Sequence, residues 1–342
     1  MSKALRLAVV GATGAIGTEL LKIIDERDFP QTVFVPLASS EKRGATVEFQ
    51  GEDLDVLNLE TFDFSQVDLA FFATPKAISE LYAPKAVKQG CLVIDASSAF
   101  RLKEDCPLCV ANLNEEALSM HRGLIAQPEA VSMALALVLA PLKEAVGLER
   151  VGVTALMSVS ALGLNGVREL EQQIGDLLNM REMSKGVFKE QIAFNILPYV
   201  GNFKDNDSTS LENELPSEVL KILEAEDFKL AFTCLQIPLF YGHGLSVNLE
   251  TLEPLTAKQA RAILVQSQGV KVLDNPMAQA YPQPFEAIGC DQILVGRIRE
   301  DSTQKRGLNL WMSFDNVHTA AALNMVKIAE ILVRDNLIAK LQ

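Results

Sequence analysis

A run of closely spaced glycines near the start of the chain is the first group of residues with a recognisable chemical use. Gly11, Gly14 and Gly17 follow the apolar segment Leu5–Val10 and precede an amphipathic stretch from Thr18 to Arg27. This order predicts a buried strand, a tight turn and a helix, whose free N–H groups would attract the pyrophosphate of a dinucleotide. The cofactor-binding residues expected from this turn are Gly11, Thr13, Gly14, Ala15, Ile16 and Gly17.

A second strand, expected at Val33–Leu37, leads to residues that could recognise the ribose of such a cofactor. In dinucleotide-binding folds the segment about twenty residues after the glycine turn contacts the adenosine ribose. Lys42 and Arg43 would favour the 2′-phosphate of NADP, whereas Glu41 would favour the free 2′-hydroxyl of NAD. The sequence leaves the choice between NAD and NADP open. The other candidate cofactor residues in this segment are Ser39 and Ser40.

Two of the five cysteines, Cys106 and Cys109, have the C-x-x-C spacing of a metal or redox pair. No second pair and no neighbouring histidine completes a zinc-binding set, so we expect two structural thiols and no metal. An odd number of cysteines, in a chain long enough to fold without disulfides, favours a reducing compartment. We therefore expect a cytoplasmic protein.

The length and charge of the chain limit its organisation and its partners. A chain of 342 residues predicts two domains. The net charge of −13, from 44 acidic and 31 basic residues, argues against nucleic acid and against a membrane surface as partners. A small anionic ligand would need a local site of backbone N–H groups or placed cations. We expect no signal peptide at the start of the sequence, and no run of about 20 apolar residues is present, so a soluble protein is expected.

The pattern of strands and helices changes about a third of the way along the chain. Strands expected at Val67–Phe72 and Cys91–Asp95 flank a helical stretch at Ala77–Lys88, an alternation typical of a parallel, doubly wound sheet. After Leu124 longer strands follow one another, which indicates an α+β unit with a large sheet. These strands are expected at Val151–Ser158, Lys229–Leu239, Leu245–Leu252 and Gln292–Ile298.

Two helices complete the predicted architecture. A capping box opens a helix at Thr256–Gln259, and a long apolar-faced helix is expected from Thr319 to Leu337, rejoining the first domain. The prediction is an α/β protein with a Rossmann-type dinucleotide-binding domain at 1–127 plus 320–342. The second domain, at 128–319, is predicted to be an α+β unit.

Several stretches of the chain resemble those of aspartate-semialdehyde dehydrogenases, in the same order and at similar spacing. They are Gly11–Gly17, Val93–Arg101, Ala193–Pro198, Val295–Arg299, Gly307–Trp311, 315–316 and 321–324. The chain is identified as a member of this family and looks most like its USG-1-like branch. The resemblance implies a homodimer whose second domain serves both dimerisation and substrate binding. The implied reaction, in amino-acid biosynthesis, is the NADPH-dependent reduction of β-aspartyl phosphate to the semialdehyde.

The catalytic cysteine implied by this resemblance is absent. The family places it at the start of a helix, and the matching position in Ile125-Ala-Gln-Pro-Glu-Ala is Ala130. A thioester cannot form on a methyl group, so the family's covalent route should fail. The neighbouring Glu129 is either a base or nucleophile, or a helix-start carboxylate stabilised by the helix dipole.

Other implied substrate residues are partly replaced. The family's substrate-orienting glutamine falls on Met157, its carboxylate-binding arginine on Gln236, and a phosphate-binding lysine on Glu214. Arg101 matches the phosphate-binding arginine and His243 the acid–base histidine. Each of these two could instead be structural, with Arg101 paired to a neighbouring aspartate and His243 a satisfied polar residue.

Positions beside these residues are altered as well. The serine expected after the histidine is Gly244, and the family's Arg-Lys-Gly-Ala-Ala becomes His318-Thr-Ala-Ala-Ala322. The methyl group of Ala320 could crowd the nicotinamide, whereas Asn324 of the cofactor site is retained.

Four hypotheses follow from this pattern. The first is a homodimer that lacks the family's activity and could retain nucleotide binding. The second is an NAD(P)-dependent oxidoreductase without a cysteine nucleophile, using His243 as proton donor and Arg101 as anion anchor. The third is a regulatory partner subunit of an active paralogue. The fourth is that the alignment is shifted and Cys234 reaches the site.

Overall fold

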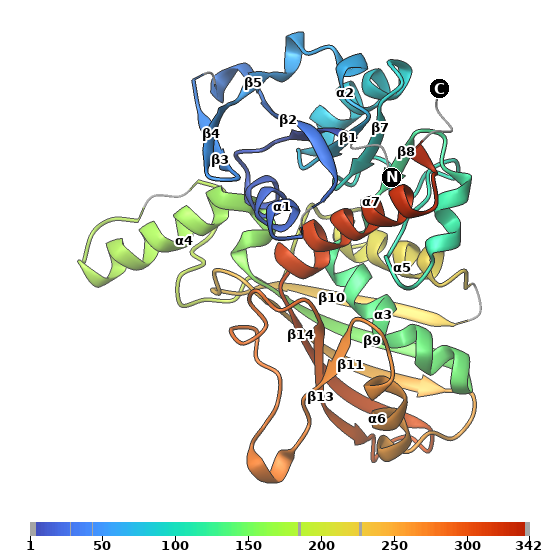
Figure 1. Cartoon of the computed structure of the whole chain (residues 1–342). Coiled ribbons are helices and arrows are strands. Elements are labelled where there is room, and N and C mark those ends of the chain that lie inside the picture. The colour runs from blue at the N-terminus through green and yellow to red at the C-terminus, as the bar shows by residue number, and fades with distance from the viewer. Residues whose placement is uncertain (1–4, 28, 43, 184–185, 226–227, 339–342) are drawn as a thin grey trace. The chain divides into compact units, whose positions relative to one another are not determined.

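The chain forms two compact units, one of which is assembled from both ends of the sequence. The computed structural model describes residues 5–27, 29–42, 44–183, 186–225 and 228–338. The first unit comprises Met1–Glu129 and Ala321–Gln342, and the second Ala130–Ala320 (Figure 1). We describe each unit by itself.

The first unit is built on a six-stranded sheet in which every neighbouring pair of strands is parallel. The strand order is β5-β2-β1-β6-β7-β8, so the order reverses at the neighbours β1 and β6. Such a reversal leaves a crevice at the carboxyl ends of the strands, where doubly wound sheets bind ligands. The strands are β1 (Leu5–Val10), β2 (Gln31–Ala38), β5 (Leu57–Asn58), β6 (Leu69–Phe72), β7 (Leu92–Asp95) and β8 (Leu124–Ala126), with a separate antiparallel pair, β3 (Thr46–Phe49) and β4 (Glu52–Asp55).

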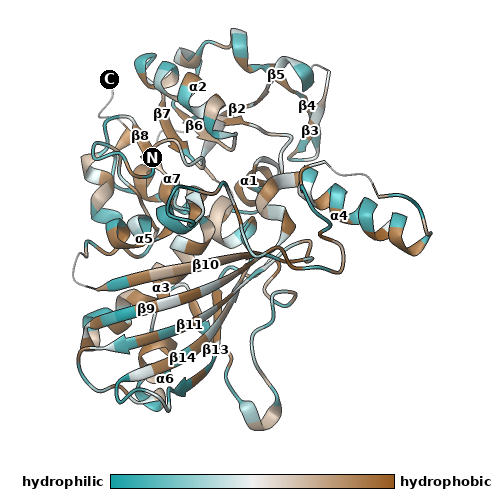
Figure 2. Ribbon diagram, turned by 180° about the vertical axis from the view of Figure 1, so that it is seen from behind, coloured by the Kyte–Doolittle hydropathy of each residue, from teal (hydrophilic) through white to brown (hydrophobic). Residues whose placement is uncertain are grey.

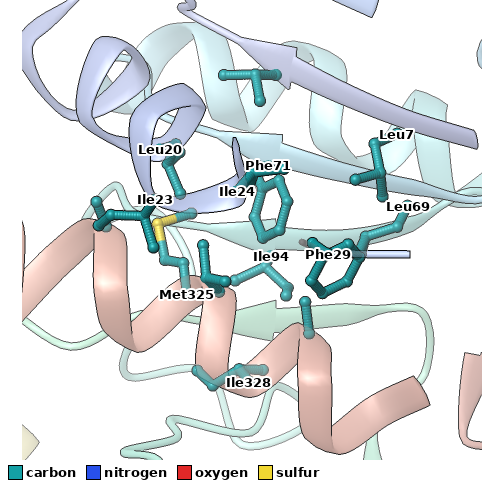
Figure 3. Packing of buried hydrophobic residues seen from close by; sticks show 14 of the residues in the cluster. Leu7, Leu20, Ile23, Ile24, Phe29, Leu69, Phe71, Ile94, Met325 and Ile328 are labelled. Atoms are coloured by element: carbon teal, nitrogen blue, oxygen red, sulfur yellow. The ribbon is translucent and has the colours of Figure 1, made fainter. Parts of the chain in front are cut away.

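Two helices from opposite ends of the sequence cover one face of this sheet. Helix α1 (Ala15–Glu26) buries Leu20, Ile23 and Ile24, which are spaced to lie along one side of the helix. They share a core with Met325 and Ile328 of α7 (Asn324–Arg334) and with apolar residues of the sheet, as Figure 3 shows. The C-terminal helix therefore belongs to the first unit. The other helices here are α2 (Lys76–Lys88) and the short 3-10 turns η1 (Ser40–Lys42), η2 (Leu59–Thr61), η3 (Phe64–Gln66) and η4 (Glu115–Met120).

The second unit contains a six-stranded mixed sheet in the order β10-β9-β11-β14-β13-β12. The central pairs are antiparallel, and the edge strands β10 and β12 run parallel to their neighbours. Helices α3 (Ala130–Val146), α5 (Ser210–Ile222) and α6 (Ala257–Val265) pack against these strands. The strands are β9 (Leu148–Met157), β10 (Lys229–Gln236), β11 (His243–Thr251), β12 (Val270–Val272), β13 (Ile293–Glu300) and β14 (Gly307–Phe314).

The helices of the second unit have clear local causes. Helix α3 (Ala130–Val146) is apolar along most of its length and largely buried, whereas α5 (Ser210–Ile222) and α6 (Ala257–Val265) begin with capping boxes. Helix α4 (Gly163–Leu178) alternates between hydrophobic and hydrophilic positions (Figure 2). Its Leu170 belongs to a smaller core with residues 188–197. The remaining short turns are η5 (Val159–Leu162) and η6 (Pro276–Ala278).

The predicted α/β fold with a Rossmann-type unit and a second α+β unit is confirmed, but the final helix differs from its prediction. The expected helix from Thr319 to Leu337 begins as a π-helix at His318–Leu323, continues as α7 and ends at Arg334. The cause is Asp315, whose carboxylate accepts the N–H groups of Val317 and His318, while its carbonyl accepts that of Ala320 at 3.0 Å. The wider five-residue turn follows from these bonds.

Across the residues that the structure describes, no helix is both long and apolar enough to cross a lipid bilayer.

Candidate functional site

The glycine turn after β1 is shaped by main-chain contacts that leave no room for side chains. A Cβ atom on Gly11, whose φ is +86°, would lie 2.3 Å from the carbonyl oxygen of Ala73. A Cβ atom on Gly17 would lie 2.1 Å from the carbonyl oxygen of Gly11. The turn is thus pressed against the residue after β6, and α1 is pressed against the turn. This is the close approach that brings a pyrophosphate-binding loop onto its sheet.

The start of α1 offers N–H groups to an anion. Gly14 is its N-cap, and within the described residues no side chain caps this end. The first N–H groups of a helix have no partner inside it, so those of the first turn, at Ala15 and Ile16, are available to a ligand. Thr18 bonds back to the carbonyl of Gly14 at 2.9 Å and leaves these groups free. The predicted residues Thr13, Gly14, Ala15, Ile16 and Gly17 therefore form an end that fits a dinucleotide pyrophosphate.

The predicted ribose residues lie at the carboxyl end of β2. Ser39 and Ser40 are exposed, and Ser40 donates a hydrogen bond of 2.9 Å to Glu60. Glu41 and Lys42 are exposed in η1, whereas Arg43 lies outside the described residues.

Arg101 of the first unit contacts main-chain carbonyl groups. Its Nε donates to the carbonyl of Gln127 at 3.0 Å, and one terminal nitrogen donates to that of Ala96 at 2.9 Å. Nearby, Asp95 at the end of β7 is fully buried and accepts bonds from Ser79 and Ser97. Burial raises the pKa of Asp95, and these serine bonds and the charge of Arg101 oppose the rise. The structure therefore gives Arg101 a contribution to loop structure, and its implied phosphate role stays a prediction.

Asn324, which the family resemblance assigns to the cofactor site, is buried in a hydrogen-bond network of the first unit. Its Oδ1 accepts the N–H of Ala111 at 2.9 Å, and its Nδ2 donates to the carbonyl of Cys109 and the side chain of Gln127 at 3.1 and 2.6 Å. This amide connects α7 to the loop at residues 109–111, and any contact with a cofactor would be additional to these bonds.

His243 in the second unit is enclosed by a polar cluster that the sequence did not predict. Its Nδ1 lies 3.2 Å from the backbone N and 3.0 Å from Oγ of Ser158. Ser158 and Ser160 contact each other at 2.9 Å, and both bond to Asn316. Ser158 and Ser160 follow β9 and Asn316 follows β14, so the sheet brings residues far apart in sequence around one ring. The alternation Ser-Val-Ser after an apolar strand was the one available signal.

The geometry indicates the charge state of His243. Because the N–H of Ser158 can only donate, Nδ1 is the acceptor and a neutral ring carries its proton on Nε2. Complete burial lowers the pKa of His243 to about 3 from its ordinary 6.5, so the ring is neutral at pH 7. Among the described residues, Nε2 is a buried atom without a hydrogen-bond partner. The ring thus presents an unused N–H donor inside the second unit.

The positions that the family resemblance assigns to substrate binding lie within the secondary structure of the second unit. Met157 and Gln236, at the paired ends of β9 and β10, are each 2% exposed, and Nε2 of Gln236 donates to the carbonyl of Met157 at 2.8 Å. Ala130 is the first residue of α3, which packs on β9 and β11, and it follows Glu129 directly. Glu214 is half-buried within α5. Of these positions, Met157 and Gln236 lie close to His243, because Met157 directly precedes Ser158, whose backbone N–H and hydroxyl contact the histidine ring.

Gly244 packs directly against the ring of Trp311 on the adjacent strand β14. A Cβ atom on Gly244 would lie 2.6 Å from two ring carbons of Trp311. The indole is held in place by Nε1 bonds of 3.0 Å to the carbonyl of Pro282 and to Ser313. The serine that the family resemblance implies at this position therefore does not fit beside this tryptophan.

The two cysteines of the second unit lie on other elements than Ala130. Cys234 is buried on β10, and its N–H donates to Glu212 at 2.9 Å. The half-buried Cys290 has its Sγ 3.2 Å from the carbonyl of Glu286. Within the described part of the chain, no group of three or more His, Cys, Asp and Glu side chains could hold a metal ion.

Comparison with known proteins identifies the family. The models described as "Semialdehyde dehydrogenase, NAD binding domain" and "Semialdehyde dehydrogenase, dimerisation domain" match residues 6–121 and 139–319. The aspartate-semialdehyde dehydrogenase of Legionella pneumophila is 44% identical over 341 residues, covering 99% of this chain and 98% of that protein. Aspartate-semialdehyde dehydrogenase 2 of Vibrio cholerae is 40% identical over 337 residues, covering 98% of this chain and 99% of that protein.

Solved structures of similar proteins superpose on nearly the whole length of this chain. Aspartate semialdehyde dehydrogenase II of Vibrio cholerae, complexed with ASA, has a TM-score of 0.94 at 39% identity and covers 98% of this chain and 99% of its own. A probable aspartate-semialdehyde dehydrogenase of Pseudomonas aeruginosa has a TM-score of 0.93 at 37% identity, covering 98% and 100%. The chain, with its NAD(P)-binding unit and its dimerisation unit, belongs to the aspartate-semialdehyde dehydrogenase family.

Proposed function

We propose that this chain is a homodimer of the USG-1-like branch that keeps a nicotinamide-dinucleotide site but does not catalyse the thioester-dependent reduction of aspartyl phosphate. The observation that carries the proposal is Ala130 at the first position of α3. A helix N-terminus lowers the pKa of a thiol placed there, but a methyl group has neither a proton to lose nor a lone pair to share.

The remaining site residues support this proposal. β-Aspartyl phosphate is an anion, and its carboxylate would be held best by a bidentate arginine. Gln236 is neutral, and its amide already donates to the carbonyl of Met157. Met157 is apolar. The two side chains offer no charge to an anionic substrate, so binding as well as chemistry should be impaired.

Similar proteins are named as aspartate-semialdehyde dehydrogenases, so activity of this chain in the same reaction is the alternative to be tested. An activity assay decides between an active and an inactive chain. Purified chain is mixed with aspartate semialdehyde, phosphate and either NADP or NAD, and formation of the reduced nicotinamide is followed by absorbance. The Vibrio cholerae enzyme serves as positive control. We expect no turnover above background, and turnover within about a hundredfold of that enzyme's would refute the proposal.

The variant Ala130→Cys supplies a matched comparison. The new thiol at the start of α3 should be alkylated by iodoacetamide faster than the thiols of the unaltered chain, because a helix N-terminus stabilises the thiolate. We expect little turnover from this variant, because Met157 and Gln236 are unchanged. Full activity on this single replacement would show that Ala130 is the sole obstacle.

The unpartnered N–H of His243 favours a second candidate, a carbonyl oxidoreductase without a covalent intermediate. A bound nicotinamide would supply the hydride, and the turn from Gly11 to Gly17 would hold its pyrophosphate. Nε2 of His243 would donate a hydrogen bond to a carbonyl oxygen. Because the pKa is lowered to about 3, the ring acts as a hydrogen-bond donor at pH 7. A panel of neutral aldehydes tests this candidate, and His243→Ala should abolish any activity found.

The dimerisation unit supports a homodimer, and it also allows association with an active paralogue as a regulatory partner. Size-exclusion chromatography with light scattering tests self-association. Co-expression with a tagged active dehydrogenase tests the mixed complex, which is abandoned if only self-association is found.

A further inference from the structure

The carboxyl ends of β2 and β5 lie side by side, and the residues that follow them meet. Leu37 pairs with Leu57 and Ala38 with Asn58, so Ser39 and Ser40 continue from one strand and Leu59 and Glu60 from the next. This is the edge of the sheet at which a doubly wound fold contacts the adenosine ribose of a dinucleotide. Glu60 is twenty residues from Ser40 in sequence, and only the pairing of the two strands brings it to this edge.

Glu60 is held at this edge from two sides. Its backbone N–H donates to Oδ1 of Asn58 at 3.0 Å, which sets the start of η2. Its Oε1 accepts the hydroxyl proton of Ser40 at 2.9 Å. The Ser40 hydroxyl, which could donate to a 2′-phosphate, is therefore already committed to a carboxylate, and a phosphate could recruit it only by displacing Glu60.

The charges near this edge are equal in number, because Glu41 and Glu60 are exposed near Ser40 while Lys42 and Arg43 follow Glu41 in sequence. The preference therefore depends on the position of Glu60 against Ser40. A free 2′-hydroxyl can donate to a carboxylate, whereas a 2′-phosphate is a dianion that a carboxylate repels. A ribose hydroxyl could share Glu60 with Ser40, because a carboxylate accepts several hydrogen bonds.

We propose that Glu60 is a specificity-determining residue that makes the first unit prefer NAD over NADP. The inference rests on the nucleotide site proposed above. The glycine turn cannot distinguish NAD from NADP, because both cofactors contain the same pyrophosphate, whereas Glu60 lies where the two cofactors differ.

Isothermal titration of the full chain with NAD and with NADP tests this preference without relying on activity. The unaltered chain should bind NAD roughly tenfold more tightly, the size expected for one hydrogen bond to a charged group. Glu60→Gln should bring the two dissociation constants within about threefold of each other, by weakening NAD, which loses its charged hydrogen-bond acceptor, and by strengthening NADP, which no longer meets a carboxylate. Higher salt should narrow the difference in the unaltered chain, because it screens the repulsion.

Glu52→Gln is the matched control, since it removes the same charge from an exposed position on β4 in the separate two-stranded sheet. It should leave the ratio of the two dissociation constants unchanged. Tighter binding of NADP by the unaltered chain, or an unchanged ratio in Glu60→Gln, would overturn the role of Glu60 while leaving the nucleotide site intact. Failure of both cofactors to bind would instead refute the nucleotide site, and the inference would fall with it.

Discussion

The glycine turn of the first unit and the His243 cluster of the second differ in what maintains them. Around Gly11 and Gly17 the constraint is contact between main-chain atoms, so any side chain would disturb the fold itself. At Met157 and Gln236 the fold accepts neutral, buried residues joined by a hydrogen bond, and at Ala130 it accepts a half-buried methyl group. Side chains at the second set of positions can therefore change while the fold and the glycine turn are kept. A side chain at Gly11 or Gly17, by contrast, would disturb the main chain itself.

The largest expected effect tests whether the buried site of Gln236 in the second unit can accommodate a charged side chain. Gln236→Arg would place a guanidinium at a site that is 2% exposed, and it should lower the free energy of unfolding by about 3 kcal/mol or more. Urea unfolding followed by the fluorescence of Trp311 measures this change in free energy. Trp311 lies on β14, so it reports on the second structural unit, which contains Gln236.

Gln236→Met is the control, because it is similar in volume and uncharged. It should cost about 1 kcal/mol, the loss of one hydrogen bond. A stable Gln236→Arg variant that gained further stability from aspartate or succinate would mean that a carboxylate site persists there, contrary to the comparison.

The next effect tests the first region. Gly17→Ala would force a methyl group to within 2.1 Å of the Gly11 carbonyl oxygen, and we expect a loss of about 2–3 kcal/mol together with loss of nucleotide binding. Circular dichroism and titration calorimetry measure the two losses. Gly14→Ala is a graded control, since its nearest atom would be 3.3 Å away. Equal effects of the two substitutions would show that main-chain contact is not the constraint.

The contrast also explains how much could be predicted from sequence. The strand Leu5–Val10 was predicted at its observed bounds because its turn and its apolar run are local signals. The π-helical start of the last helix was not, because it depends on Asp315, whose other carboxylate oxygen is fixed by the N–H of Gly289 at 2.9 Å.

The same distinction holds at the sites. The glycine turn is visible as a motif, and His243 was found through the family resemblance. Its partner Ser158, and Asn316 that bonds to Ser158, come together only through the pairing of β9, β11 and β14. Glu60 likewise reaches Ser40 only through the pairing of β2 with β5.

A third prediction concerns pH. A histidine whose pKa falls from 6.5 in the unfolded chain to about 3 when folded binds fewer protons in the folded state. Stability is therefore retained above pH 6.5 and lost as the pH falls from about 6.5 towards 3. Between pH 7 and pH 5 the loss attributable to His243 should be about 2 kcal/mol.

Comparing the unaltered chain with His243→Gln isolates this contribution from other titrating groups, such as Asp95, whose raised pKa has the opposite sign. Urea midpoints at the two pH values, read from Trp311, should converge for the variant. A pH dependence that is the same in both proteins would mean that His243 keeps an ordinary pKa in the folded chain, and the burial argument for a permanently neutral ring would be wrong.

The smallest effect compares a glycine that the fold requires with one that it does not. Gly175 lies within α4, and a Cβ atom there would meet nothing within 4 Å among the described residues. Gly175→Ala should raise stability by about 0.5–1 kcal/mol, because alanine loses less backbone entropy in a helix. The thermal midpoint of the Trp311 transition measures the gain. A loss of stability at Gly175 comparable to that at Gly17 would mean that glycine is needed for reasons other than main-chain contact, and the distinction between the two regions would then have to rest on the side chains around His243 alone.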